Sequence, residues 1–360
     1  MKRLFLFLFL LPMLSCARQE VRLQKSMEYA TLLKVGEDEV ISICPFDGTE
    51  DTLRVTEPFG RVICMSTSHV AFLDALGCDS VICGVSGVNF VSSLELRSRN
   101  VPDVGYDQAP DYEKIVALKP DVLLAFKVSS AESPFISKLE SLGIRVFTLY
   151  EFLENHPLGR AEYIKAFGTV TGRRHEADSI FTTVSSLYNS LKVLRNSPNG
   201  LGPSHFSPEG SSSGPESESD SETSVKVLIN IPYGDLWYIP GGDSYMSQLI
   251  KDAGGEILGA KEGETTSRTI SLEEAYILST EADIWLNTGW CRTRADLESA
   301  NPLFGKFEID RIYNNTLRTN PEGGNDFWES GCVRPDLILQ DLRRIFSGEG
   351  GQLFYYVEVK

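Results

Sequence analysis

The sequence predicts an α/β protein with two lobes, each with a central parallel sheet, and one long helix between them. From residue 61 onward, short apolar runs typical of buried strands alternate with amphipathic stretches that stop at glycine or before proline, as helices do. Strands and helices in alternation form parallel sheets with right-handed crossovers. Hydrophobic residues make up 42% of the 360 positions, which is enough to fill two ordinary cores.

The first lobe is expected over residues 61–170. Strands are predicted at 62–65, 81–85, 122–126 and 146–150. Helices are predicted at 69–76, 112–118 and 134–142, and they end at Gly77, before Pro120 and at Gly143. Residues 17–60 form an N-terminal extension, in which runs near 29–35, 39–44 and 52–55 predict short strands added to this lobe as an antiparallel unit.

The connecting helix is expected over 171–196, because apolar residues from Ala177 to Leu194 recur three and four positions apart. Residues 197–224 are almost entirely Ser, Gly, Pro and Glu, which predicts a disordered surface insert. The second lobe follows over 225–346, with strands at 225–230 and 284–287 and helices at 244–253, 271–278 and 335–346. Residues 347–360 are expected to be a C-terminal tail.

The first sixteen residues are typical of a lipoprotein signal peptide. Lys2 and Arg3 precede the apolar run 4–11, which is too short to span a bilayer as a permanent helix, and Cys16 follows a small residue. We expect cleavage before Cys16 and lipidation of its thiol. An ordinary cleaved signal with a spare cysteine is the alternative. Either processing exports the protein, and lipidation would anchor it in the cell envelope, facing the periplasm, with the lipid as its one membrane contact.

Composition argues against several classes of protein. A formal net charge of -16 disfavours binding to nucleic acid, and no stretch outside the signal has the length of a transmembrane helix. Six further cysteines, without zinc-ribbon spacing, indicate no structural metal. We favour buried thiols over disulfides for Cys64 and Cys83, which lie in apolar runs, although an oxidising compartment would permit disulfides. The six are Cys44, Cys64, Cys78, Cys83, Cys291 and Cys332.

The signatures of common enzymes are missing. The sequence has no GxSxG, GxxxxGK[ST] or HExxH motif, and the four histidines, at 69, 156, 175 and 205, are scattered. A site for a bare zinc or manganese ion would need several converging His and carboxylate ligands. We therefore expect a binding protein without a cofactor or a directly bound metal ion.

Candidate ligand residues follow the predicted strands, because open parallel sheets bind ligands beyond the carboxyl ends of their strands. All four tryptophans lie in the second lobe, and three occupy such loops, which suits a cleft for a large, flat or aromatic ligand. Any one of them could instead be a core residue. The candidates are Ser68, His69, Phe90, Phe126 and Lys127 in the first lobe and Trp237, Tyr238, Trp290, Arg294 and Trp328 in the second.

Several segments resemble the helical-backbone periplasmic binding proteins for iron-siderophores and cobalamin. They are RVICMSTSHVAFLDALG at 61–77, VPDVGY at 101–106, DYEKIVALKPDVLLAF at 111–126, GGDSYM at 241–246, SLEEA at 271–275 and RPDLIL at 334–339. The resemblance implies two Rossmann-like lobes with central parallel sheets joined by a single long rigid helix, here 174–195. It also implies a ligand held between the lobes, and it adds Tyr106, Tyr245 and Arg334 to the candidate ligand residues.

The resemblance further implies the substrate-binding lipoprotein of an ABC importer, acting as a monomer. Its ligand would be an iron complex, siderophore or haem, or else a corrinoid, and its partners a permease with its ATPase. Glu113 and Glu273 match the acidic residues that dock on permease arginines in this family. Both lie in the first turn of a predicted helix, where the helix dipole stabilises glutamate in any case. The alternative hypotheses are a metallochaperone or enzyme on the same fold, and a scavenging lipoprotein without a permease.

Overall fold

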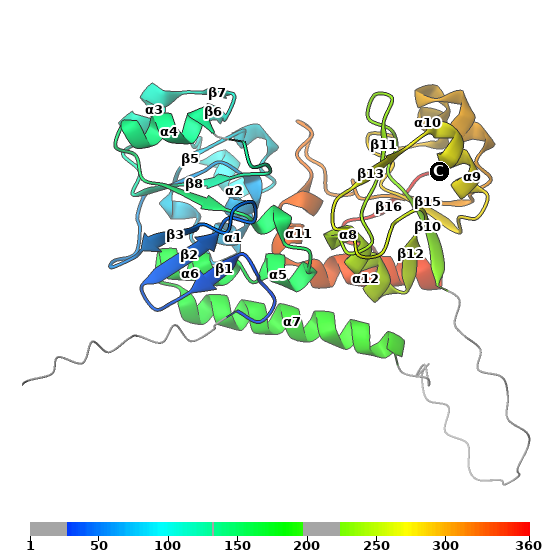
Figure 1. Cartoon of the computed structure of the whole chain (residues 1–360), viewed down its shortest axis with the longest axis horizontal. Coiled ribbons are helices and arrows are strands. Elements are labelled where there is room, and N and C mark those ends of the chain that lie inside the picture. Colours follow the sequence, from blue (N-terminus) through cyan, green and yellow to red (C-terminus); the bar gives the residue numbers. More distant parts are fainter. Residues whose placement is uncertain (1–26, 132, 197–223) are drawn as a thin grey trace, which may run out of the picture.

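The computed structural model describes residues 27–131, 133–196 and 224–360. Two α/β lobes lie side by side, and the long helix α7 (Arg174–Asn196) runs beneath both of them (Figure 1). The predicted fold class is therefore confirmed. The expected signal peptide and, apart from Ser224, the expected insert at 197–224 lie outside the described residues.

The N-terminal lobe is built on a four-stranded parallel sheet in the order β5-β4-β8-β9. The chain runs from β4 to β5 on one side and then to β8 on the other, so the topological switch point lies between β4 and β8. Ligands of such sheets bind at this point. The strands are β4 (Val62–Cys64), β5 (Ile82–Val85), β8 (Val122–Phe126) and β9 (Val146–Leu149).

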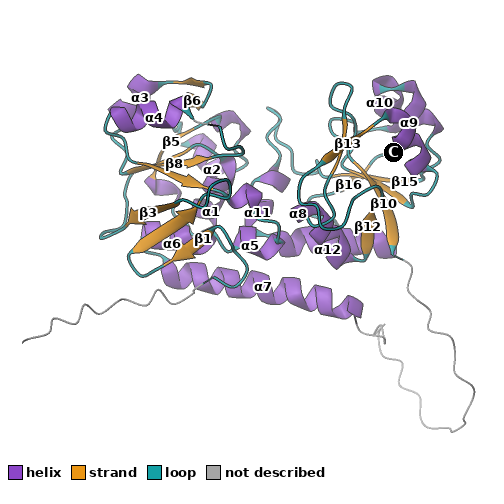
Figure 2. Ribbon diagram, in the orientation of Figure 1, coloured by secondary structure: helices purple, strands orange, loops and turns teal. Residues whose placement is uncertain are grey.

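Helices cover both faces of this sheet (Figure 2). Side-chain caps define where several of them begin, because each satisfies a main-chain N–H of the first turn. Ser66 caps α1 (Thr67–Ala75), Asp111 caps α3 (Tyr112–Leu118) and Ser133 caps α4 (Pro134–Ser141). The remaining helices are α2 (Leu94–Ser98), α5 (Pro157–Ala161) and α6 (Ile164–Thr171).

The C-terminal lobe repeats this topology. Its sheet has the order β12-β10-β14-β15-β16, and the switch point lies between β10 and β14. Its parallel strands are β10 (Val225–Ile229), β12 (Gly255–Ile257), β14 (Ile284–Leu286) and β15 (Arg311–Asn314). A separate two-stranded antiparallel sheet pairs β11 (Trp237–Ile239) with β13 (Arg268–Ile270). Its helices are α8 (Tyr245–Ala253), α9 (Leu272–Ser279), α10 (Arg294–Ala300), α11 (Ser330–Val333) and α12 (Pro335–Ser347).

The last residues of the chain correct the expectation of a tail over 347–360. They return to the lobe as β16 (Val357–Glu358), which pairs antiparallel with β15. The physical reason is Asp341 of α12, whose buried carboxylate accepts the main-chain N–H groups of Phe354, Tyr355 and Tyr356. Tyr355 and Tyr356, which lead into β16, are fully buried, so this end of the chain contributes to the core.

The N-terminal extension forms an antiparallel sheet of β1 (Leu33–Val35), β2 (Glu39–Ile43) and β3 (Glu50–Arg54). Two buried carboxylates of the N-terminal lobe hold the chain that leads into it. Glu162 accepts the main-chain N–H groups of residues 28–30, and Glu154 accepts those of residues 31 and 32, all within 2.8–3.0 Å. The extension is thereby bound to the lobe through its backbone.

Helices of the two lobes pack against each other next to α7. α11 of the C-terminal lobe packs against α1 and α5 of the N-terminal lobe, and α7 packs against both α6 and α12. The guanidinium of Arg160 lies 3.8 Å from the centre of the Tyr245 ring across this boundary. No helix within the three described stretches has the length and apolar character needed to cross a membrane.

Candidate ligand-binding site

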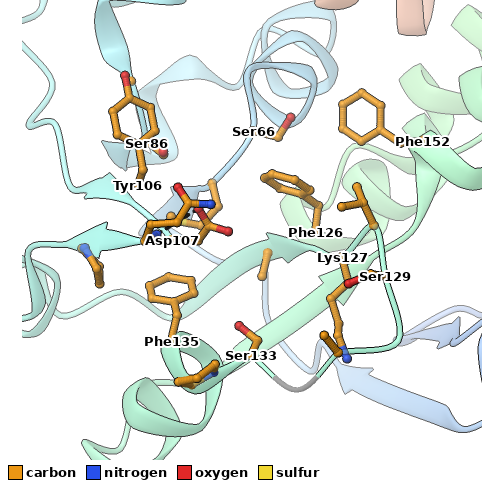
Figure 3. A pocket seen from close by; sticks show the side chains of 18 of the residues that line it. Ser66, Ser86, Tyr106, Asp107, Phe126, Lys127, Ser129, Ser133, Phe135 and Phe152 are labelled. Atoms are coloured by element: carbon orange, nitrogen blue, oxygen red, sulfur yellow. Dashed lines mark hydrogen bonds between the residues drawn. The ribbon is translucent and has the colours of Figure 1, made fainter. Parts of the chain in front are cut away.

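A cavity of about 900 Å³ lies at the switch point of the N-terminal lobe (Figure 3). The loops that follow β4, β5 and β8 form its base, and the hairpin of β6 (Gly105–Tyr106) and β7 (Ala109–Pro110) forms one side. The volume lies within the range of 300–1,000 Å³ usual for small-molecule sites. Its place is the one that the sheet topology predicts for a ligand.

Aromatic side chains dominate the wall of the cavity. In Figure 3, Tyr106 and Asp107 lie on one side and Phe126 and Phe152 on the other. The last two rings pack edge to face, with centroids 6.0 Å apart. Six aromatic side chains line the space, namely Phe90, Tyr106, Tyr112, Phe126, Phe135 and Phe152. Such a wall suits a ligand with flat unsaturated groups, which stack on aromatic rings.

The polar groups of the wall are few and mixed. Lys127 and Asp107 are its charged side chains. Five aliphatic hydroxyls accompany them, those of Ser66, Thr67, Ser86, Ser129 and Ser133, together with the amide of Gln108 and the phenols of Tyr106 and Tyr112. Among the described residues, no group of three or more His, Cys, Asp or Glu side chains is placed to hold a metal ion. The wall therefore offers stacking surface, one cation and hydroxyl groups to a ligand, and its chemistry fits a complexed metal better than a bare one.

Asp103 fixes two of the loops that form the cavity, and sequence reasoning missed this residue. Its carboxylate accepts the main-chain N–H groups of Val88 at 3.2 Å and of Gly105 at 2.8 Å. The backbone of Gly105 has φ +76, and a Cβ there would overlap the carbonyl of Ala109, so glycine alone fits this position of the hairpin. The sequence contains a signal for this arrangement, an aspartate two residues before a glycine in a turn.

Four of the predicted ligand residues line the cavity together: Phe90, Tyr106, Phe126 and Lys127. The N-terminal lobe supplies the whole lining, including Tyr112, Phe135 and Phe152, which sequence reasoning did not single out. Tyr112 and Phe135 belong to the first turns of α3 and α4. The sequence contains a signal for these two residues: each is an aromatic residue in the first turn of a predicted helix, and such a turn lies near the loops that bind ligands.

The structure corrects the expectation for Ser68 and His69. Both are fully buried in α1, and both contact Glu151: the Ser68 hydroxyl donates to Oε1 at 2.8 Å, and His69 Nε2 lies 3.2 Å from the same oxygen. Burial raises the pKa of the Glu151 carboxyl, but His69 and the Ser68 hydroxyl outweigh it and lower that pKa overall. Ser66 and Thr67, at the start of the helix, face the cavity instead.

Trp237 is likewise a core residue, which corrects its expected place in the cleft. It is 1% exposed, stacks on Trp285 with centroids 6.0 Å apart, and donates from Nε1 to the carbonyl oxygen of Ile229 at 2.9 Å. After β10 the chain reverses at the antiparallel bridge between Tyr233 and Leu236, and β11 then pairs with β13 outside the main sheet. The position of a tryptophan after a strand did not reveal this reversal of direction.

Three further candidate ligand residues form contacts within the protein instead, which corrects the ligand-binding role expected for them. Tyr245 is buried beneath Arg160 at the boundary between the lobes. Arg294 donates to the main-chain oxygens of Ile309 and Asp310. Arg334 forms a two-point ion pair with Asp336, at 2.9 and 2.7 Å. Arg294 and Arg334 are thus both engaged by groups of the C-terminal lobe.

Tyr238, Trp290 and Trp328 are exposed but do not line the cavity. Trp290, the most exposed at 62%, follows β14 at the switch point of the C-terminal lobe. Trp328 ends the short 3-10 turn Asp326–Trp328. The ligand-binding role expected for these three residues stays a prediction.

Glu113 and Glu273 are exposed in the first turns of α3 and α9. Both helices lie on the side of the lobes away from α7 (Figure 1). Ser271 caps α9 by accepting the N–H of Glu274, and the Glu274 side chain pairs with Arg268 at 2.8 Å. Neither Glu113 nor Glu273 has an ion-pair partner among the described residues. The six cysteines of the described part are free thiols.

The topology and the cavity define a two-lobed binding protein whose lobes one helix connects. The family model for periplasmic binding proteins matches residues 62–193, which comprise the N-terminal lobe and most of α7. Over these residues the chain is similar to the periplasmic binding proteins, and its two lobes joined by one helix are the fold of the helical-backbone class of these proteins. This class consists of substrate-binding components of ABC transporters and not of enzymes.

Relatives and solved structures agree with this assignment. An uncharacterized lipoprotein of Methanocaldococcus jannaschii is 25% identical over 334 residues, which cover 88% of this chain and 72% of the relative. The uncharacterized ABC transporter substrate-binding lipoprotein YvrC of Bacillus subtilis is 24% identical over 213 residues, or 59% of each chain.

Two solved structures show the same fold. A periplasmic heme binding protein from Pseudomonas aeruginosa superposes with a TM-score of 0.60 at 19% identity, covering 84% of this chain and 98% of the other. The periplasmic vitamin B12 binding protein BtuF of Vibrio cholerae superposes with a TM-score of 0.55 at 13% identity, covering 82% and 99%. At these identities the likeness concerns the fold and not the ligand.

Proposed function

We propose that this protein captures an iron complex, a siderophore or haem, in the cavity of the N-terminal lobe and delivers it to an ABC permease. The observation that carries this proposal is the wall of six aromatic side chains around about 900 Å³, with Lys127 among the lining residues. Aromatic rings stack on the flat groups of haem or an aryl siderophore. The ammonium of Lys127 would attract the negative charges that such complexes carry.

A corrinoid is the second candidate. The wall has one lysine and one aspartate, so its formal charges cancel. Its five aliphatic hydroxyls could form hydrogen bonds with an amide-rich, nearly neutral ligand as well as with an anionic one. The fold is shared with binding proteins for heme and for vitamin B12, so it does not separate the two candidates. The charge of the ligand is the property that distinguishes them.

The test uses purified protein titrated with hemin, a ferric tricatecholate and cyanocobalamin, with tyrosine and tryptophan fluorescence or calorimetry as the readout. We expect Lys127→Gln to weaken binding of the two anionic complexes about tenfold and to leave cyanocobalamin unaffected. Lys138→Gln, on the exposed face of α4, is the matched control. Binding of cyanocobalamin alone would establish the corrinoid, and binding of none of the three would refute both candidates.

The partners in this proposal are a permease and its ATPase, with Glu113 and Glu273 as the docking residues. Their support is exposure on the face away from α7, one on each lobe. Two charges held at a fixed separation by two rigid helices suit a receptor with two matching cations. Lipidation at Cys16 belongs to the same proposal, and its support is that the two relatives above are both named lipoproteins.

A further inference from the structure

A segment of the C-terminal lobe reaches the N-terminal loop that carries Phe90. Residues 318–329 lie between β15 and α11 and rise between the two lobes (Figure 1). Thr319 and Asn325 form an isolated antiparallel bridge, and the main-chain N–H of Asn320 donates to the carbonyl of Gly324 at 2.8 Å. The segment is therefore a narrow turn with its tip toward the other lobe.

Asn320 makes the central contact between this turn and the N-terminal lobe. Its Nδ2 donates to the carbonyl oxygens of Asn89 at 3.0 Å and Val91 at 3.2 Å. Its Oδ1 accepts the N–H groups of Glu322 and Gly324 within its own turn, at 3.1 and 2.8 Å. The amide thus forms hydrogen bonds through both its nitrogen and its oxygen. The bonds to its oxygen orient the side chain, and the bonds from its nitrogen hold the loop of residues 89–91.

Gly324 and Glu329 complete the contact on either side of Asn320. A Cβ at Gly324 would overlap the carbonyl oxygen of Phe90, so the two backbones touch at a point where any other residue would be excluded. Glu329 is 3% exposed, and its two carboxylate oxygens accept the N–H of Ser92 at 3.0 and 2.8 Å. At the rim, Arg97 pairs with Glu322 at 2.7 Å.

The loop 88–92 is consequently held from both lobes. Asp103 of the N-terminal lobe binds its beginning through the N–H of Val88, and the turn of the C-terminal lobe binds the rest. Phe90 lies between these attachments and lines the cavity. The position of the Phe90 ring therefore depends on contacts from the C-terminal lobe, which contributes no residue to the lining.

We propose that Asn320, Gly324 and Glu329 form an interlobe clamp that positions Phe90 in the wall of the cavity. These are positioning residues, because they touch the loop and not the cavity. The C-terminal lobe thereby sets the affinity of a cavity that the N-terminal lobe lines. The statement about affinity rests on the proposed function, whereas the restraint on the loop does not.

The first experiment measures the restraint without any ligand. We expect hydrogen–deuterium exchange of peptides covering 88–93 to be about tenfold faster in Asn320→Ala, because both hydrogen bonds from this side chain to the loop are lost. Gly324→Ala, which separates the backbones, should act in the same direction. Asn155→Ala, an exposed asparagine outside the clamp, should exchange as the wild type does. Unchanged exchange in both clamp variants, with folding verified by circular dichroism, would overturn the clamp.

The second experiment measures the consequence for binding, with hemin, a ferric tricatecholate and cyanocobalamin as probes. For each probe that the wild type binds, we expect Asn320→Ala to bind roughly threefold to tenfold more weakly and Asn155→Ala to bind equally well. A loop that exchanges faster while affinity stays constant would refute control of the cavity by the clamp. A wild type that binds no probe would refute the proposed function, and the exchange data would still decide on the clamp.

Discussion

Glu329 of the C-terminal lobe accepts the main-chain N–H of Ser92 of the N-terminal lobe with both carboxylate oxygens, at 3.0 and 2.8 Å. The contact is buried, and burial raises the pKa of Glu329 to about 8, with the nearby carboxylates of Asp326 and Asp74 adding to the effect and the bonds from Ser92 opposing it. A carboxyl group at the boundary between the lobes thus carries a proton at neutral pH.

This pKa predicts how stability depends on pH. A carboxyl whose pKa is higher in the folded than in the unfolded chain stabilises the fold fully at low pH, and the contribution is lost as the pH rises toward 8 and beyond. We expect the wild type to lose unfolding free energy relative to Glu329→Gln as the pH rises from 5 to 9, because glutamine mimics the protonated carboxyl and stays neutral. Urea unfolding at several pH values measures it, with Glu349→Gln, an exposed site, as the control. A constant difference would contradict the prediction.

Two tryptophans of the C-terminal lobe should respond differently to removal. Trp237→Ala should lower the unfolding free energy by about 3–5 kcal/mol, because it leaves a cavity between Trp285 and Phe307. Trp290→Ala, at an exposed side chain, should change it by less than about 0.5 kcal/mol. Chemical denaturation of both variants provides the test. Equal losses would show that the packing around Trp237 contributes little.

The N-terminal extension should depend on the carboxylate of Glu162. This side chain is fully buried and accepts three main-chain N–H groups of the extension, so Glu162→Gln, which replaces one oxygen by a donor, leaves some of them unsatisfied. We expect a loss of about 2–3 kcal/mol and faster proteolysis within residues 27–60. Glu37→Gln, exposed on the same extension, should behave as the wild type does. Proteolysis at the wild-type rate would argue against this attachment.

Docking and ligand capture should be separable by charge reversal. The double variant Glu113→Arg, Glu273→Arg should lower transport in proteoliposomes with the cognate permease roughly tenfold or more, because each reversed charge repels a cationic receptor. Ligand affinity and the circular dichroism spectrum should not change. Glu37→Arg with Glu256→Arg places the same charge change on exposed sites of both lobes and controls for net charge. Full transport by the docking variant would remove these residues from the interface.

Membrane attachment should require Cys16. We expect the wild type to partition into detergent and Cys16→Ser to remain in the aqueous phase, because stable attachment takes more than one lipid chain and the thiol is the point of modification. Phase separation followed by mass spectrometry of the mature N-terminus gives the answer. Equal partitioning of both forms would assign the attachment to another feature.

The sequence by itself determined the fold class, because the periods of apolar residues are local properties. Alternating runs from residue 61 identified the strands β4, β5, β8 and β9, and the three- and four-residue spacing identified α7. Loops after strands also placed Phe90, Phe126 and Lys127 at the cavity, since parallel strands bring their carboxyl ends to one edge, and the family resemblance added Tyr106.

Tertiary structure alone decided which of the neighbouring candidates face that cavity. Ser68 and His69 follow Ser66 and Thr67 directly, yet a helix rotates each residue by about 100° from the last, and that rotation carried them into the core with Glu151. Trp237 lies buried after a reversal of the chain between β10 and β11, which a pattern of strand and loop residues does not reveal. The contact of Asn320 with Asn89 joins positions 231 apart in the chain, and no local pattern encodes it, because it exists only where the two lobes have packed against each other.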